Sequence, residues 1–146
     1  SVLALGREAW SVEHKGEPTG GPGGIELYDI TDLAAPQQLA AIEPPESPDP
    51  SRNGIWTSAH NFELSDDRLY SSWYDGGITI HDISEPADPT RIAAWRNPDE
   101  ASFWTAQQAA AGETVVASSI GRRGSEPGVW LFPDRAGRQP DWPPLE

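Results

Sequence analysis

Three histidines are the side chains of this 146-residue chain best suited to metal binding or acid–base chemistry. His60 precedes Asn61 in a segment that we expect to be a strand, where an imidazole could ligate a metal ion or act as a general base. His14, His60 and His81 are not paired at metal-ligand spacing, and the chain contains no cysteine. The sequence therefore predicts no metal site and no cofactor, and it assigns no catalytic residue.

Carboxylates are the second candidate class. Asp29 and Asp82 occupy the same place in two copies of a repeated segment, and this favours a role in a turn, because a catalytic residue needs to occur only once. Asp66 and Asp67, together with Asp75, could hold a calcium ion through oxygen ligands, although the spacing of a calcium-binding loop is not present. We favour the alternative interpretation, that these residues form acidic turns.

An internal repeat supplies the elements that must position these residues. Residues 24–42 and 77–95 align at an offset of 53 positions, with eight identities and four conservative exchanges among 19 positions. A period near fifty residues with strand-like segments in each copy is typical of β-propeller blades. His81 corresponds to Tyr28 of the first copy, so we predict that it is a packing residue.

The repeat divides the chain into units and predicts an all-β fold. We expect a partial blade of three strands in residues 1–42, a complete blade in 54–95, a partial last blade in 103–134 and an exit segment in 135–146. The expected fold is a β-propeller fragment of about two and a half four-stranded antiparallel blades. Because a propeller closes with at least about four blades, we expect partner polypeptide: the remaining N-terminal part of the same propeller, or symmetry copies.

Four polar residues are predicted to line the central channel of this propeller. His60 and Asn61 lie in residues 56–64, the predicted innermost strand of the complete blade, and Gln107 and Gln108 stand at the matching place of the last blade. These four are the candidate binding residues. Two interpretations of His60 stay open: a ligand or base at the channel mouth, or a bond to the backbone of a neighbouring blade or to water, which we favour.

Charge narrows the range of partners. Asp and Glu number 23 against 10 Lys and Arg, the net charge is −13, and Lys15 is the one lysine. Such a balance argues against binding to nucleic acid phosphates and to anionic lipid surfaces. No apolar run approaches the length of a membrane-spanning helix. An acidic, lysine-poor composition indicates a halophilic source, since concentrated salt screens carboxylate repulsion; an ordinary acidic protein is the alternative.

The repeated strands also carry a resemblance to a known family. Residues 25–30 (IELYDI) and 78–83 (ITIHDI) each precede a proline-containing turn, and the chain in this respect resembles the LVIVD-repeat proteins. Residues 60–77 look like the preceding strands of the same family, and the resemblance extends over about residues 1–134. With the acidic composition, the chain is similar to a haloarchaeal member. The resemblance implies a β-propeller and an extracellular or cell-surface location, but no particular activity.

These observations favour a module without catalytic activity. We expect a propeller that presents loops for binding a protein or another ligand, and we do not classify the chain as an enzyme. The alternative is a propeller enzyme or metal-binding oxidoreductase with its site at the channel mouth, mostly on blades outside this chain.

The halophilic interpretation predicts that stability depends on salt. As monovalent salt falls from molar to tens of millimolar concentration, screening of the crowded carboxylates is withdrawn, so the melting temperature should fall. Thermal melts across that range measure the effect. A melting temperature independent of salt would contradict the halophilic interpretation but not the propeller.

Overall fold

The structure is a computed structural model, and it describes residues 1–8, 23–45, 55–109, 114–122 and 124–133. The described part is all-β, with ten strands in three antiparallel sheets and one 3₁₀ turn, η2 (Ile55–Thr57). The all-β class predicted from the sequence is confirmed. His14 and the exit segment predicted for residues 135–146 lie outside the described residues.

Each sheet is built from strands that follow one another in the chain. The first sheet has the order β1-β2-β3, formed by Val2–Gly6, Ile25–Asp29 and Gln37–Ile42. The second has the order β4-β5-β6-β7, formed by Phe62–Ser65, Arg68–Ser72, Ile78–Asp82 and Thr90–Trp95. The third has the order β10-β9-β8, formed by Pro127–Pro133, Thr114–Ile120 and Phe103–Ala109.

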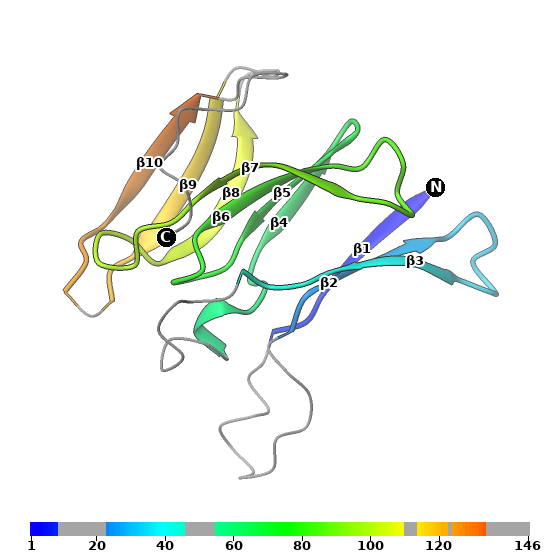
Figure 1. Cartoon of the computed structure of the whole chain (residues 1–146), viewed down its shortest axis with the longest axis horizontal. Coiled ribbons are helices and arrows are strands. Elements are labelled where there is room, and N and C mark those ends of the chain that lie inside the picture. Colours follow the sequence, from blue (N-terminus) through cyan, green and yellow to red (C-terminus); the bar gives the residue numbers. More distant parts are fainter. Residues whose placement is uncertain (9–22, 46–54, 110–113, 123, 134–146) are drawn as a thin grey trace, which may run out of the picture.

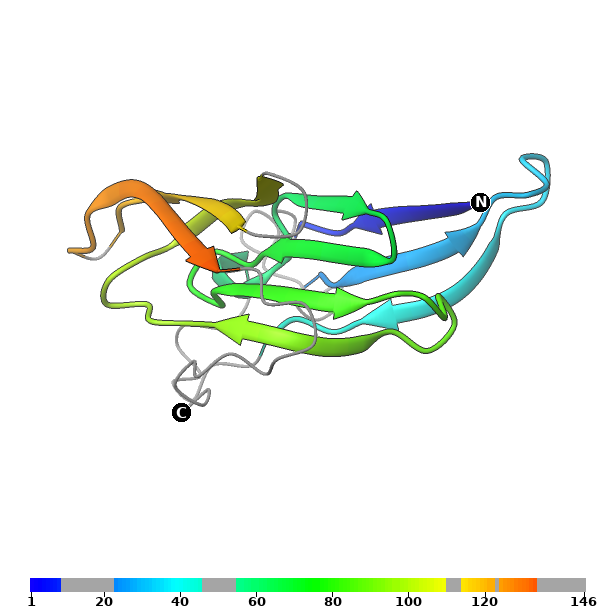
Figure 2. The same cartoon turned by 90° about the horizontal axis from the view of Figure 1, so that it is seen from above.

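The three sheets lie side by side in chain order, with the second sheet in the middle (Figures 1 and 2). Residues of one apolar cluster join the first and second sheets, among them Ile25, Leu27 and Leu69. A second cluster joins the second and third sheets, among them Ile80 and Phe103. Since both its faces are covered, β6 is buried at its first four positions. The middle sheet is therefore the core of the described structure.

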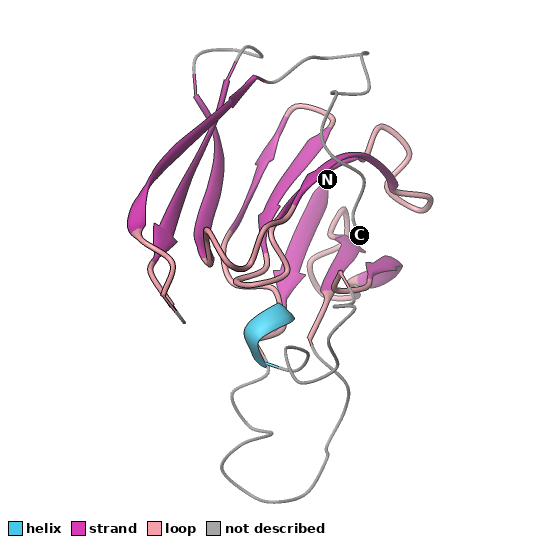
Figure 3. Ribbon diagram, turned by 60° about the vertical axis from the view of Figure 1, so that its left-hand side comes forward, coloured by secondary structure: helices cyan, strands magenta, loops and turns pink. Residues whose placement is uncertain are grey.

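The predicted strand over residues 56–64 is wrong in its first half. Trp56 lies in η2, the helical turn drawn in cyan in Figure 3, and β4 begins only at Phe62. The Asn61 N–H donates to the Ser72 hydroxyl at 3.2 Å, and this hydroxyl in turn donates to the Asn61 carbonyl at 2.8 Å. The Ala59 N–H donates instead to the Gly23 carbonyl beside the first sheet, at 2.9 Å. The backbone of His60 and Asn61 still bonds to that of Ser72, at 3.0 and 2.9 Å, but the Ser72 hydroxyl takes the Asn61 N–H, so the regular ladder begins only at Phe62.

The turn role predicted for Asp29 and Asp82 is confirmed. Asp29 Oδ1 accepts hydrogen bonds from the Thr31 N–H (2.8 Å) and hydroxyl (2.6 Å). Asp82 Oδ1 accepts the same pair from Ser84, at 2.9 and 2.7 Å. Bonds that favour the charged carboxylate lower the pKa of both acids, chiefly through the Thr31 hydroxyl at Asp29 and the Ser84 N–H at Asp82. Each turn follows a β-bulge at corresponding positions, Leu27/Tyr28 and Ile80/His81.

His81 is buried in β6, as expected for a packing residue, but its imidazole has an unsatisfied nitrogen. The residue is 6% exposed, and Nδ1 has no hydrogen-bond partner among the described atoms. Burial, and secondarily the charge of Arg91, lowers the pKa of His81 from 6.5 to about 4. The folded protein therefore holds this imidazole in its neutral form at neutral pH.

We predict that this histidine makes folding pH-dependent. Between pH 6.5 and about 4 the unfolded chain binds a proton at His81 and the folded protein does not. Folding stability should therefore fall as the pH drops through that window, by on the order of 3 kcal/mol. Denaturant unfolding of the wild type and of the matched variant His81→Gln measures it, and the variant should lose most of this slope. The pKa values of Asp29 and Asp82 are lowered by their turn hydrogen bonds, away from this window. An equal slope in both proteins would contradict the assignment to His81.

Candidate functional site

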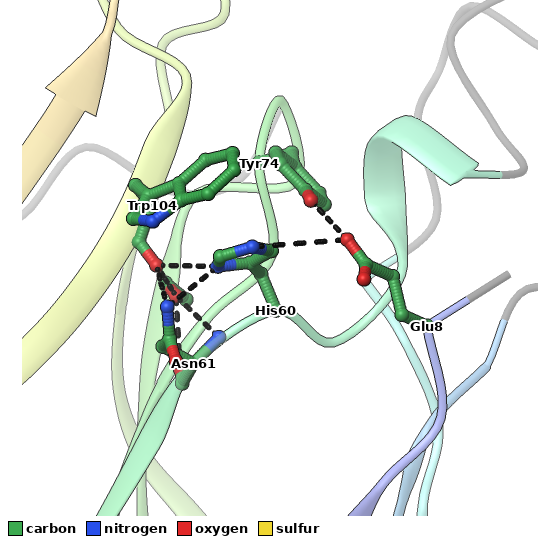
Figure 4. Close-up of polar contacts among 6 residues, drawn as sticks. Glu8, His60, Asn61, Tyr74 and Trp104 are labelled. Carbon is green, nitrogen blue, oxygen red and sulfur yellow. Dashed lines mark hydrogen bonds and ion pairs between the residues drawn. The ribbon is translucent and has the colours of Figure 1, made fainter. Parts of the chain in front are cut away.

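Chain segments from all three sheets meet at one end of the molecule. Glu8 follows β1 of the first sheet, His60 and Tyr74 lie before β4 and after β5 of the second, and Trp104 is in β8 of the third. Figure 4 shows these side chains facing one another, with Asn61 beside His60. We call Glu8, His60, Asn61, Tyr74 and Trp104 the loop-end cluster.

Tyr74 is the centre of the loop-end cluster. It is fully buried, and its φ of 51° places it in the left-handed region that residues other than glycine rarely adopt. Its N–H donates to the Phe103 carbonyl at 3.1 Å, and its carbonyl accepts the Phe103 N–H at 3.0 Å, so the strained backbone is clamped to the third sheet. Gly77 ends the same turn at a φ of 90°, where a Cβ would lie 2.0 Å from the Trp95 carbonyl oxygen.

The phenol of Tyr74 reaches the opposite way, toward the first sheet. Its hydroxyl donates a hydrogen bond to the Glu8 carboxylate. Burial first, and then this bond and the negative charge of Glu8, raise the pKa of Tyr74 well above its usual range, although Arg122 opposes the shift. The hydroxyl is therefore a neutral donor at physiological pH and is not suited to act as a base or nucleophile.

The His60 ring is held on both nitrogens and on its faces. Nδ1 lies 2.8 Å from the Trp104 carbonyl oxygen, and Nε2 lies 3.7 Å from Glu8 Oε1. The ring contacts Trp104 with centroids 3.8 Å apart and meets Tyr74 edge-on at 4.7 Å. Asn61 Nδ2 lies 2.7 Å from His60 Nδ1 and donates to the Trp104 carbonyl at 3.0 Å. The interpretation favoured from the sequence, a bond from His60 to neighbouring backbone, is what the geometry shows.

A buried ion pair lies beside the loop-end cluster. Asp75 is 2% exposed, and its Oδ2 accepts a hydrogen bond from Arg122 at 2.9 Å. The guanidinium carbon of Arg122 lies 3.1 Å from the centroid of the Trp56 ring, a cation–π contact. The pair ties the β9–β10 connection to the β5–β6 turn.

The calcium alternative does not fit these positions. Asp66 and Asp67 are exposed in the β4–β5 turn, while Asp75 is buried beyond the other end of β5. Within the described ranges, no group of three or more His, Cys, Asp or Glu side chains could hold a metal ion. Asp75 is committed to Arg122 instead.

The four candidate residues from the sequence do not form one site. His60 and Asn61 come together near the start of β8, but Gln108 lies near its end and contacts the other end of β4. Gln108 Oε1 accepts a hydrogen bond from Ser65 at 2.6 Å, and its N–H donates to Glu63 at 2.9 Å. Gln107 is exposed. Gln108 therefore fastens β8 to β4, away from the loop-end cluster.

Sequence reasoning missed Glu8, Tyr74 and Arg122 as members of this region. No repeat position or motif distinguishes Glu8 or Arg122, since each meets its partner only through the packing of separate sheets. Tyr74 does carry a signal: it stands directly before the Asp75-Gly76-Gly77 turn, where a residue can be forced into a left-handed conformation.

Comparisons with known proteins assign no family. No protein-family model matches the chain, and no curated protein matches it either. Among the residues that the structure describes, no helix has the length and apolar character needed to cross a membrane.

We predict that Tyr74→Phe destabilises the fold more than Tyr28→Phe. Both hydroxyls donate to a glutamate, Tyr74 to Glu8 and Tyr28 to Glu26 at 2.7 Å, but only Tyr74 is fully buried. Removing the hydroxyl of the fully buried tyrosine, with its bond to a charged group, should lower the free energy of unfolding by about 1–3 kcal/mol, and the half-buried control should lose less. Denaturant titrations compare the two variants. Equal losses would contradict a special role for Tyr74.

Proposed function

We propose that the chain is part of a β-propeller of the LVIVD-repeat kind, in which each of the three sheets is a blade. The proposal is supported by antiparallel sheets that follow the chain and pack face to face in chain order. It is also supported by the 53-residue offset, which relates the bulges and aspartate turns of the first two sheets. On this proposal the three sheets amount to about two and a half blades of four strands.

Exposed apolar faces at the two outer sheets support a larger assembly. Leu3 and Leu5 are exposed on β1, and Val129 and Leu131 are exposed on β10. Exposed apolar surface, where it is large enough, marks interaction sites. We propose that these faces pack against further blades, supplied by the remaining part of the same propeller or by symmetry copies.

The proposed role of the module is binding, without catalysis. The observation that carries this proposal is that the polar side chains of the loop-end cluster are engaged with one another and with backbone. His60 is fixed by Trp104 and Asn61, and the Glu8 carboxylate accepts the Tyr74 hydroxyl. Such groups join the sheets and leave the surrounding connections to contact a protein or small ligand.

The proposed setting is a halophilic organism, with the module exported or at the cell surface. Acidic residues at turns are exposed, including Asp32, Asp66, Asp67, Glu85 and Asp88, which is the distribution that keeps carboxylates hydrated in concentrated salt. The location comes from the family resemblance alone.

The second candidate function is a metal-binding or oxidoreductase site at the same end of the sheets. His60 Nε2 and Glu8 Oε1 face each other at 3.7 Å, and the Tyr74 hydroxyl contacts the same carboxylate. An imidazole whose other nitrogen is anchored on backbone carbonyl resembles an oriented metal ligand.

We predict that the purified protein holds no stoichiometric metal. Elemental analysis of the wild type and of His60→Gln tests this, together with their melting temperatures. On the binding-module proposal the variant melts at lower temperature because it loses its contacts with Trp104 and Glu8, and neither protein contains bound metal. A stoichiometric transition metal in the wild type that is lost in His60→Gln would overturn the proposal in favour of the second candidate.

A further inference from the structure

Among the residues that the structure describes, strand β10 ends its sheet without the outer neighbour that the corresponding strands have. In the first sheet β2 pairs with both β1 and β3, and in the second β6 pairs with both β5 and β7. In the third sheet, β10 pairs with β9, and no further strand lies beside it among the described residues. One row of β10 backbone groups thus faces away from its own sheet.

The side chains of β10 identify the matching positions. Trp130 and Phe132 point toward the second sheet and join its apolar cluster, so the alternate residues Val129 and Leu131 point the other way. These two are 71% and 69% exposed. Aligned on Gly128, the second residue of β10, and on Gly77, which precedes β6, Val129 and Leu131 correspond to Ile78 and Ile80.

Those corresponding positions are buried in the other two sheets. Ile25 and Leu27 of β2 are 1% and 0% exposed, and Ile78 and Ile80 of β6 are 1% and 3% exposed. In each sheet the cover comes from the next sheet and from the outer strand. On β10, both are missing from the described structure.

The two outer strands that are present share one sequence pattern. Residues 39–42 of β3 read Leu-Ala-Ala-Ile, and residues 92–95 of β7 read Ile-Ala-Ala-Trp. Their register is also the same. The large residue that ends the pattern lies opposite the first buried position of the neighbouring strand: Ile42 opposite Ile25, and Trp95 opposite Ile78. The first alanine lies opposite the second buried position: Ala40 opposite Leu27, and Ala93 opposite Ile80.

We propose that β10 binds an extended peptide segment as a fourth antiparallel strand, with the pattern large aliphatic–Ala–Ala–large apolar. Its last residue lies beside Val129 and its first alanine beside Leu131. Addition of a strand to an open sheet edge gains main-chain hydrogen bonds, while the alternate side chains select the sequence. The proposal rests on the equivalence of the three sheets as blades, which is part of the proposed function.

The chemistry of β10 favours this occupant. Its seven residues, PGVWLFP, include no charged side chain, and charge is a common protection of exposed edge strands. The net charge of −13 disfavours an acidic segment. The expected partner is therefore a neutral or basic segment, as in β7, where Arg91 precedes the pattern.

A peptide with the sequence of residues 88–97 (DPTRIAAWRN) provides the probe. The fluorescently labelled peptide is titrated into the 146-residue chain in molar salt, and binding is followed by anisotropy. We expect saturable binding, no binding of a scrambled peptide of the same composition, and hydrogen-exchange protection that appears in β10 and not in β6.

Two exposed leucines give a matched pair of variants. Leu131→Lys changes the proposed surface, whereas Leu33→Lys changes a residue that is 78% exposed in the β2–β3 turn. Affinity for the peptide should fall at least about tenfold, or 1.4 kcal/mol, in Leu131→Lys and stay unchanged in Leu33→Lys. The proposal is overturned by the absence of saturable binding, by equal binding of the scrambled peptide, or by equal effects of the two variants.

Sedimentation velocity on the same samples separates this proposal from the proposed function. In one outcome the peptide does not bind, and the chain forms a dimer that Leu131→Lys dissociates. A second copy of the chain then covers β10, so the strand proposal fails, whereas the interpretation of the sheets as blades stands. In the other outcome β10 gains no protection from hydrogen exchange, and Leu131→Lys changes neither peptide binding nor self-association. The third sheet is then not equivalent to the other two, and the blade interpretation fails together with the strand proposal.

Discussion

The left-handed backbone of Tyr74 is the constraint on which the packing of the three sheets depends. A regular continuation of β5 would alternate its side chains across the sheet. The positive φ instead lets the main chain bond to Phe103 of the third sheet while the phenol reaches Glu8 of the first. One residue of the middle sheet thus contacts both neighbours, and its conformational strain is offset by two backbone bonds and complete burial. His60 and Trp104 then pack around a ring whose position is already fixed.

Local signals in the sequence were enough to predict the strand framework. The second copy of the repeat, residues 77–95, contains β6 and β7, and the first copy, residues 24–42, contains β2 and β3 in the same order. The aspartate turns were predictable because Asp29 and Asp82 bond to residues only two positions away. The segment before β4 was not, since its alternatives to a ladder come from Ser72 and from the first sheet. Hydrogen bonds to residues that are distant in the sequence do not change the alternation of apolar and polar residues from which a strand is predicted.

In the candidate site, too, local features of the sequence were predictable and contacts between distant segments were not. Residue type alone identified His60, and its bond to the neighbouring sheet follows from its place before an inner strand. Glu8 and Arg122 reach the region from the β1–β2 and β9–β10 connections. Their roles exist only when separate sheets pack, so spacing along the chain could not predict them. Gln107 and Gln108 matched His60 in the alignment, but the start of β8 and not its end lies beside the histidine.

The two-sided burial of the middle sheet has a consequence for the order of folding. Its four strands are joined in sequence by short turns, so its contacts are local, and local contacts favour fast folding. The first sheet buries one face against it and needs it as a template. During synthesis, however, β1 and β2 leave the ribosome before any of the middle sheet exists. Ile25 and Leu27, fully covered in the finished protein, therefore spend that interval exposed to solvent or to chaperones.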